Sequence, residues 1–363
     1  MSRSYLGRLR TILGVMLSAT ALLGALLVWL PTPWFNLWIA HFVAVELGRQ
    51  LAFCGLAGAL ALRDWRFRGL ALVASVLCAL PAERTRYAVD RLPAAVSRAV
   101  GAAPTVTKDV ALSPEVSVDL YEPAEPGRHP LVVVVHGGSW HAGEKGEVPH
   151  VSAALARHGA LVADVHYRLA PDHLFPSPLA DVKCALGSLR TRPDVDSTRV
   201  FALGRSAGGH LALMAALTVG LPDFAPSCPV PDLPLTGVIA IYPTTDFVFG
   251  DANAPSPDPI DNRGAYRDLL GFAPASAPDR AAAASPVKHV ERAGPLKVLL
   301  IHGEADRLVP VEHTTRLAAA LRAAGNVPEV YTLTGADHAF DHHPGSPADV
   351  FALGRIAAMV LDP

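Results

Sequence analysis

The stretch VFALGRSAGGH, residues 200–210, decides the fold of this chain. Its first four residues are apolar, which is typical of a strand buried in a parallel sheet. The next five, Gly204-Arg-Ser206-Ala-Gly208, fit the pattern G-x-S-x-G, and a helical pattern follows over residues 208–219. Small residues on both sides of Ser206 permit a tight strand-to-helix turn that exposes the serine oxygen beside a helix N-terminus. We therefore predict that Ser206 is a nucleophile.

Strand and helix patterns alternate on both sides of this stretch. Apolar, strand-like runs lie at 116–120, 131–135, 160–165, 200–203, 237–241, 297–301 and 330–333. Helical patterns lie at 151–158, 178–190, 208–219, 313–324 and 348–360. This alternation predicts an α/β fold with a mostly parallel sheet. Residues 243–293 are rich in Pro, Ala and Asp, and they predict an insertion that is a candidate lid over the site.

A glycine-rich loop follows the strand-like run at 131–135. It reads His136-Gly137-Gly138-Ser-Trp140. Glycines at such a place let the backbone approach a reacting carbonyl group and direct N–H groups at its oxygen. We expect an oxyanion hole made of the backbone amides of Gly137, Gly138 and Ala207.

Two further strand ends carry an acid and a base. His302-Gly-Glu304-Ala-Asp306 follows the run at 297–301, and Ala336-Asp-His338-Ala-Phe follows the run at 330–333. We predict that His338 is the general base and that Asp306 orients it, with Glu304 as the competing acid. Ser206, Asp306 and His338 then occur in the chain order of a known triad pattern. His338, His342 and His343 with the nearby carboxylates match no strong metal motif, so we expect neither a metal nor a cofactor.

The whole set resembles the hormone-sensitive-lipase and carboxylesterase branch of the α/β-hydrolase superfamily. The resemblance covers residues 131–341 and includes HGGSW at 136–140, HYRLAP at 166–171, GRSAGGH at 204–210, HGEAD at 302–306 and DHAF at 337–340. Two departures are Arg205, where the branch often has an acidic residue, and Ser139-Trp140, where it often has a third glycine. The resemblance implies hydrolysis of carboxylic esters through an acyl-enzyme. The HGGSW form is also similar to formamidases and prenylcysteine methylesterases, so amide or formamide hydrolysis and methylesterase activity remain alternatives.

The N-terminal part of the chain is unusually apolar. Hydrophobic residues make up 51% of the whole chain, and they concentrate in three stretches at 11–30, 34–62 and 69–80. The first is long enough to cross a bilayer and longer than the apolar part of a usual signal peptide. We expect two or three transmembrane helices in residues 1–100 and the catalytic domain in residues 101–363. The protein would lie in a bacterial inner or plasma membrane.

The charges and cysteines bear on possible partners, membrane orientation and disulfide pairing. The formal net charge is −2, and no basic patch points to nucleic acid. Arg3, Arg8 and Arg10 favour a cytoplasmic N-terminus. If all three apolar stretches span, the catalytic domain faces outward, which we favour slightly. If the third stretch only lies on the membrane surface, the domain stays cytoplasmic, and the arginines that follow this stretch, Arg84, Arg86, Arg91 and Arg98, favour that outcome. Spacing alone does not decide whether Cys184 and Cys228 pair. The expected partners are a small-molecule or lipid ester and the bilayer, and the sequence gives no oligomeric state.

Overall fold

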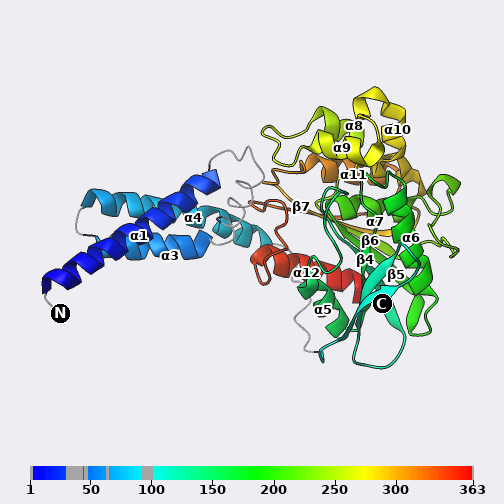
Figure 1. Ribbon diagram of the computed structural model, residues 1–363, viewed down its shortest axis with the longest axis horizontal. Helices are drawn as coiled ribbons and strands as arrows, with labels where there is room; N and C mark the ends of the chain where they lie inside the picture. The colour runs from blue at the N-terminus through cyan, green and yellow to red at the C-terminus, as the bar shows by residue number, and fades with distance from the viewer. Residues whose placement is uncertain (1–2, 30–43, 45–47, 63–64, 91–100, 362–363) are drawn as a thin grey trace.

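A computed structural model describes residues 3–29, 44, 48–62, 65–90 and 101–361. Figure 1 shows a rod of long N-terminal helices projecting from an α/β body that holds the rest of the chain. The functional motifs all lie in the body.

The body is built on one sheet of eight strands in the order β1-β2-β4-β3-β5-β6-β7-β8. The strands are β1 (Thr105–Ala111), β2 (Ser117–Glu122), β3 (His129–Val135), β4 (Leu161–His166), β5 (Val195–Arg205), β6 (Gly237–Ile241), β7 (Lys297–Gly303) and β8 (Glu329–Leu333). Strand β2 pairs antiparallel with β1 and β4. The other six strands, β3 to β8, are parallel to one another. The expected mostly parallel sheet is confirmed.

Helices cover both faces of the sheet, because its central strands are apolar on both sides. Leu131, Val133 and Val135 of β3 belong to one buried cluster, whereas Val132 and Val134 belong to the other. The first cluster includes α6 (Ser177–Arg190), α7 (Ala207–Leu217) and α11 (Glu312–Ala323). The second includes α5 (Pro149–Arg157) and α12 (Pro347–Leu361). The functional loops therefore leave a sheet that is fixed from both sides.

Strand β1 was not expected from the sequence, whereas the segment 243–293, which was expected as an insertion, contains several short helices. Strand β1 is an edge strand whose residues are almost all exposed, so its sequence lacks the apolar alternation by which a strand is recognised. The segment 243–293 contains α8 (Phe247–Ala252), α9 (Asn262–Leu270) and α10 (Pro278–Ala283), with the 3₁₀ turns η2 (Pro274–Ser276) and η3 (Pro286–Arg292). A further 3₁₀ turn, η1 (Pro222–Phe224), follows α7.

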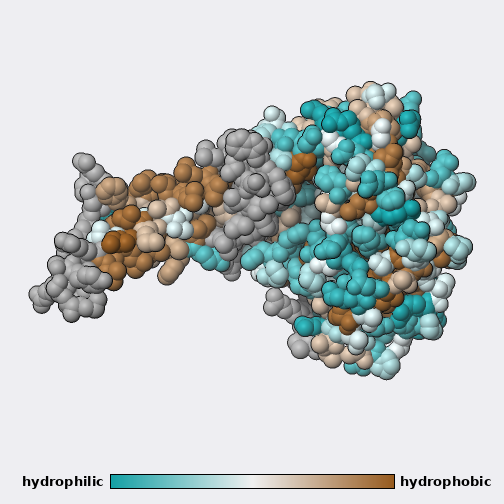
Figure 2. Space-filling model, in the orientation of Figure 1, coloured by the Kyte–Doolittle hydropathy of each residue, from teal (hydrophilic) through white to brown (hydrophobic). Residues whose placement is uncertain are grey.

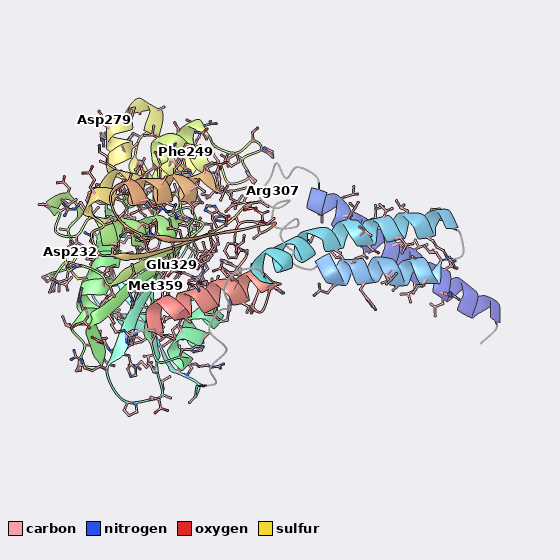
Figure 3. The ribbon with its side chains drawn as sticks, turned by 180° about the vertical axis from the view of Figure 1, so that it is seen from behind. Asp232, Phe249, Asp279, Arg307, Glu329 and Met359 are labelled. Atoms are coloured by element: carbon pink, nitrogen blue, oxygen red, sulfur yellow. A yellow bond between two sulfur atoms is a disulfide. The ribbon has the colours of Figure 1, made fainter. Side chains whose placement is uncertain are left out.

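The rod consists of α1 (Arg3–Trp29), α3 (Gly48–Ala61) and α4 (Trp65–Asp90). Small residues let these helices approach closely: a Cβ at Gly55 would come within 2.3 Å of the Ser75 hydroxyl oxygen. Large apolar side chains cover the outside of the rod, as Figure 2 shows in brown. Where the rod meets the body, α4 packs against α12 (Figure 3).

One helix within the described residues is both long and apolar enough to cross a membrane, over Leu9–Leu27 of α1. The apolar parts of the other two, Gln50–Ala61 and Phe67–Ala79, are shorter. The first part of the expected second span, apart from Ala44, lies outside the described residues. The structure thus provides one candidate span near the N-terminus where the sequence predicts two or three.

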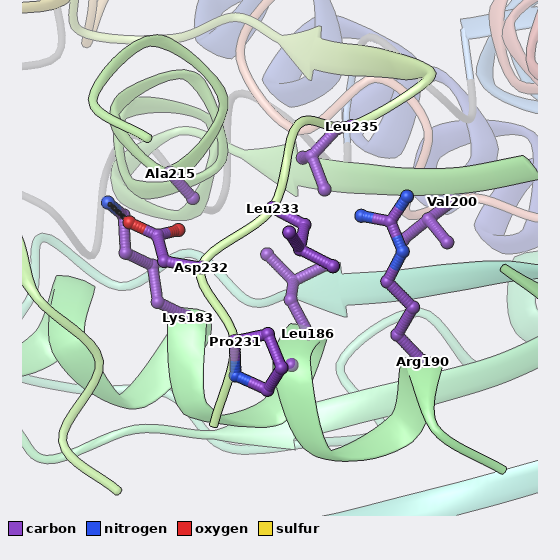
Figure 4. A pocket seen from close by; sticks show the side chains of 10 residues that line it. Lys183, Leu186, Arg190, Val200, Ala215, Pro231, Asp232, Leu233 and Leu235 are labelled. Carbon is purple, nitrogen blue, oxygen red and sulfur yellow. Dashed lines mark hydrogen bonds and ion pairs between the residues drawn. The ribbon is translucent and has the colours of Figure 1, made fainter. Parts of the chain in front are cut away.

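A disulfide joins Cys184 of α6 to Cys228, with their Cα atoms 5.4 Å apart. It holds the loop after η1 against α6. Beside it the buried Lys183 ammonium donates to Asp232 at 2.9 Å and to the Thr218 carbonyl at 2.8 Å, on one side of a small hollow (Figure 4). Most of the residues that line the hollow are apolar, and the two opposite charges in it, Lys183 and Asp232, pair with each other.

Candidate active site

Ser206 lies on the turn between β5 and α7, as the motif predicts. Its backbone has φ 52° and ψ −119°, a left-handed conformation that a serine rarely adopts. The turn is held in place because the Ser206 amide donates to the Ile241 carbonyl of β6 at 2.9 Å, and the Ser206 carbonyl accepts from the His210 amide. The side chain is therefore lifted above the strand ends, next to the N-terminus of α7.

Gly204 and Gly208 make this turn sterically possible. A Cβ at Gly204 would lie 2.0 Å from the Gly208 carbonyl oxygen, and one at Gly208 would lie 2.2 Å from the Val135 carbonyl oxygen. Both contacts are with backbone atoms, which cannot move aside. The two glycines of the motif are thus required by packing, and Gly208 also brings α7 against the end of β3.

His338 and Asp306 lie together, although 32 residues separate them. His338 Nδ1 donates to Asp306 Oδ2 at 2.7 Å, and both side chains are buried. This bond favours the Nδ1–H tautomer of the neutral imidazole, which leaves Nε2 unprotonated and able to accept a proton. Burial lowers the pKa of His338, but the Asp306 carboxylate and its hydrogen bond raise it more, so the net direction is upward.

Asp306 receives more hydrogen bonds than the sequence suggested. The amides of Leu308 and Val309 donate to Oδ1 at 2.9 and 2.8 Å. His302 Nε2 lies 3.1 Å from Oδ2, so the first residue of the HGEAD motif contacts the carboxylate directly. Burial raises the pKa of Asp306, but the charges and hydrogen bonds of His338 and His302 lower it well below its usual range. The carboxylate is therefore held ionised beside His338.

The competing residues point elsewhere. Glu304 accepts from the hydroxyls of Thr332 and Thr334 at 2.9 and 2.8 Å in an exposed position. Asp337 Oδ1 accepts from the backbone amides of Arg307 and His338, which shapes the His338 loop. Of the two carboxylates in the HGEAD motif, the structure brings only Asp306 to His338.

The glycine-rich loop lies close to Ser206. The backbone amide of Gly137, which we expected in the oxyanion hole, is already occupied by another hydrogen bond. A Cβ on Gly137 would lie 3.5 Å from that of Ser206, yet the Gly137 amide donates to Glu147 Oε2 at 2.8 Å. Glu147 follows ten residues later in a loop without a motif, so this contact could not be predicted from the sequence. Within the described part of the chain, no hydrogen bond occupies the amides of Gly138, Ser139 or Ala207. The two unoccupied amides of the glycine-rich loop are therefore those of Gly138 and Ser139, one residue further along the loop than expected.

Trp140 anchors the same loop from the other side. Ser139 and Trp140 have φ of 53° and 62°, which strains the backbone. The Trp140 indole donates to His210 Nδ1 at 3.1 Å, and His210 Nε2 in turn bonds to the Ala284 carbonyl at 2.8 Å. Burial lowers the pKa of His210 to about 4, so at neutral pH the ring is uncharged and can accept the indole hydrogen. His210 thus links the loop to residues 243–293.

Residues 243–293 pack firmly beside this link. The rings of Phe247 and Tyr266 lie 5.4 and 6.0 Å from that of Trp140. Phe247 and Tyr266 are almost fully buried. The segment therefore forms a fixed wall next to the glycine-rich loop in this structure.

A strand-end serine, a buried acid-base pair and a glycine-rich loop converge at one edge of the sheet. The profile of the BD-FAE family matches residues 118–321, which is more than half of the chain. The chain belongs to the BD-FAE family. The match to this BD-FAE domain includes Ser206 and Asp306, whereas His338 lies just beyond its end.

Curated relatives of this BD-FAE protein include esterases. Esterase LipC of Mycobacterium tuberculosis is 31% identical over 223 residues, which cover 58% of this chain and 53% of LipC. The isoprenylcysteine alpha-carbonyl methylesterase ICME of Arabidopsis thaliana is 27% identical over 246 residues, which cover 62% of this chain and 54% of ICME. The chain thus spans about half the length of the curated relatives it matches.

Solved structures show the same fold. Esterase 2 of Thermogutta terrifontis, with propionate bound, has a TM-score of 0.56 at 26% identity, covering 72% of this chain and 96% of that one. A truncated carbohydrate esterase from gut microbiota has a TM-score of 0.59 at 20% identity, covering 72% of this chain and 98% of that one. The predicted α/β-hydrolase fold is confirmed, and the names of the relatives support the prediction of a serine-type carboxylic ester hydrolase.

Proposed function

We propose that the protein hydrolyses carboxylic esters through an acyl-enzyme, with Ser206 as nucleophile, His338 as base and Asp306 as the acid that orients it. The observation that carries this proposal is the buried 2.7 Å bond between His338 and Asp306, at the same sheet edge as the strained turn of Ser206. The names of the curated relatives and of the esterase structures support the same reaction.

The reaction runs in two halves. His338 Nε2 takes the proton of Ser206 as its oxygen attacks the acyl carbon, and the leaving alcohol then receives that proton from His338. A water molecule next attacks the acyl-serine and passes its proton to the same nitrogen, which restores Ser206 and releases the acid. Asp306 stays ionised throughout and stabilises the imidazolium that forms in each half. No cofactor takes part in these steps.

The oxyanion hole of the proposal uses the amides of Gly138, Ser139 and Ala207. Gly137, which we expected to take part, already donates to the charged side chain of Glu147. That bond holds the loop in a fixed position, so the following amides are oriented before the substrate arrives. One such donor typically stabilises the transition state by about 3 kcal/mol.

Two substrate alternatives use the same residues. An amide or formamide would react by the same steps, but its leaving group is poorer. A prenylcysteine methyl ester is a second candidate, because ICME is similar to this chain over most of its catalytic body. Both candidates and a lipid-borne ester fit an enzyme attached to a membrane.

We expect the purified protein to hydrolyse p-nitrophenyl esters and to leave the matching p-nitroanilides intact. An ester has a much better leaving group, because an alcohol oxygen departs more readily from the tetrahedral intermediate than an amine nitrogen does. Initial rates across acyl chains from acetate to laurate would give the preferred length. Faster cleavage of formanilides than of esters would contradict the ester assignment and favour the formamide alternative.

The proposed organisation is a membrane region in residues 1–100 and a catalytic domain in residues 101–363. The exposed apolar side chains of α1, α3 and α4 support it, because soluble helices rarely leave so many large apolar groups uncovered. Residues 243–293 would be the wall of the acyl or alcohol pocket. The partner that fits the apolar surface of α1, α3 and α4 is the lipid bilayer.

The disulfide supports an outward-facing catalytic domain. Disulfides persist in the periplasm and outside cells, whereas the cytoplasm keeps thiols reduced. Cys184 and Cys228 both lie in the catalytic body, within a well-packed loop. This observation supports the slight outward preference against the arginines that follow the third apolar stretch, which favour a cytoplasmic domain.

A thiol-labelling experiment in native membranes tests the side. In the variant Cys54→Ala/Cys78→Ala, only Cys184 and Cys228 remain. Because they are paired, we expect a large maleimide reagent to shift the unfolded protein on a gel only after reduction. A full shift without reduction would place the catalytic domain in a reducing compartment and overturn the outward orientation.

A further inference from the structure

Arg205, the residue before the nucleophile, is buried and carries a charge. It is 1% exposed, and its Nε donates to Asp341 Oδ2 at 2.5 Å. The other oxygen of Asp341 accepts from the Tyr242 hydroxyl at 2.5 Å. The three residues come from the end of β5, the end of β6 and the loop that carries His338, so their contacts join three of the strand ends that form the site.

The surroundings of Asp341 and Tyr242 fix their protonation states. Burial raises the pKa of Asp341, but Arg205 chiefly, with His342 and the Tyr242 hydroxyl, lowers it more, so the carboxylate is ionised. Burial and the neighbouring carboxylate raise the pKa of Tyr242 well above its usual value, so its hydroxyl remains a donor. A buried ion pair of this kind typically adds little net stability compared with apolar side chains of the same volume.

The cluster lies directly against the base. The ring centroids of Tyr242 and His338 are 4.3 Å apart, and Asp341 follows His338 by three residues. The Tyr242 ring also packs edge-on against Phe340. Any movement of Asp341 or Tyr242 would therefore be transmitted to the His338 ring.

We propose that Arg205, Asp341 and Tyr242 form a positioning network that locks the His338 loop to the nucleophile turn and sets the electric field at His338. The proposal rests on the proposed esterase function. None of the three touches the reacting atoms, so each acts through His338.

The two charges of the network act on His338 in opposite directions. The Asp341 carboxylate is one of the groups that raise the pKa of His338. Arg205 offsets that carboxylate. The other titratable or charged groups that face His338 or its partners are His302, Asp306, Asp337, His342, Tyr242 and Glu147. A variant of Arg205 or Asp341 leaves these groups in place. A change in the pKa of His338 in such a variant therefore reports the loss of the network charge.

The test is the pH dependence of kcat/KM for p-nitrophenyl acetate, whose acid limb reports the pKa of the base in the free enzyme. Asp341→Asn removes a negative charge, so we expect the midpoint to move down by roughly 0.5–1 pH unit. Arg205→Met leaves Asp341 uncompensated, so the midpoint should move up by roughly the same amount. In both variants kcat should fall more than KM changes, because the substrate does not touch the network.

The control variant is Arg205→Lys, which keeps the charge and should keep the midpoint close to that of the wild type. Shifts in the same direction for Asp341→Asn and Arg205→Met, or lower rates with no shift, would overturn the proposal and leave a purely structural role. If a single variant fails to fold, Arg205→Met/Asp341→Leu decides. Because that variant removes both charges, its midpoint should stay near that of the wild type, whereas the single variant that does fold shifts it. An equal shift in the double variant and in that single variant would contradict the network. A wild type without any esterase activity would instead refute the proposed function.

Discussion

Replacing Ser206 with alanine is expected to lower kcat for ester hydrolysis by at least about 10⁴-fold, with a KM close to that of the wild type. Alanine keeps the strained turn but removes the only oxygen that can form the acyl-enzyme. Because Gly204, Gly208 and the Ile241 carbonyl hold the turn, the variant should fold and melt like the wild type. Steady-state rates with p-nitrophenyl butyrate, measured in detergent solution, give both constants.

Ser276→Ala is the matched control for Ser206→Ala. Ser276 is exposed, and its hydroxyl donates only to the nearby Ala273 carbonyl. We expect this variant to keep the wild-type kcat. An equal rate for Ser206→Ala and the wild type would refute the mechanism, because the acyl-enzyme of the proposal forms on the Ser206 oxygen.

Replacing Asp306 with asparagine is expected to lower kcat by about 10³- to 10⁴-fold. The carboxylate accepts from His338, His302 and two backbone amides, and a carboxamide cannot accept from all of them. Its NH₂ group would face His338 Nδ1 and favour the opposite tautomer, so Nε2 would carry the proton and could not act as a base. Rates measured over a pH series separate this effect from a simple shift of the profile.

Glu304→Gln is the matched control for Asp306→Asn, because it makes the same chemical change two residues away in the same motif. Glu304 is exposed and bound to Thr332 and Thr334, so we expect near wild-type rates. A large loss with Glu304→Gln and a small one with Asp306→Asn would reverse the assignment of the acid.

The central strands and the motif loops could be predicted because their signals are local. An apolar run such as 131–135 indicates a strand buried on both faces, and a glycine directly after it indicates a functional loop. In the structure, β3, β5, β7 and β8 end within a few residues of the predicted positions. Chain order then brought Ser206, Asp306 and His338 to the same edge of the sheet.

The contacts between the loops could not be predicted because they join residues that are far apart in the chain. His302 reaches Asp306 within one motif, but Glu147 holds Gly137, Trp140 meets His210 and Arg205 pairs with Asp341 across 136 residues. None of these pairs has a periodic or spacing signal. Arg205 departs from the family pattern, in which an acidic residue is frequent at this position. The structure gives a physical reason, because the Arg205 guanidinium pairs with the Asp341 carboxylate.

The central claim is that Ser206 carries the acyl group. Treatment with diethyl p-nitrophenyl phosphate, followed by peptide mapping in a mass spectrometer, tests it most directly. We predict a single diethylphosphoryl adduct on Ser206, formed at the same rate at which esterase activity is lost, and no adduct in Ser206→Ala. Loss of activity with an unmodified Ser206, or an adduct on another residue that tracks the loss, would contradict the account.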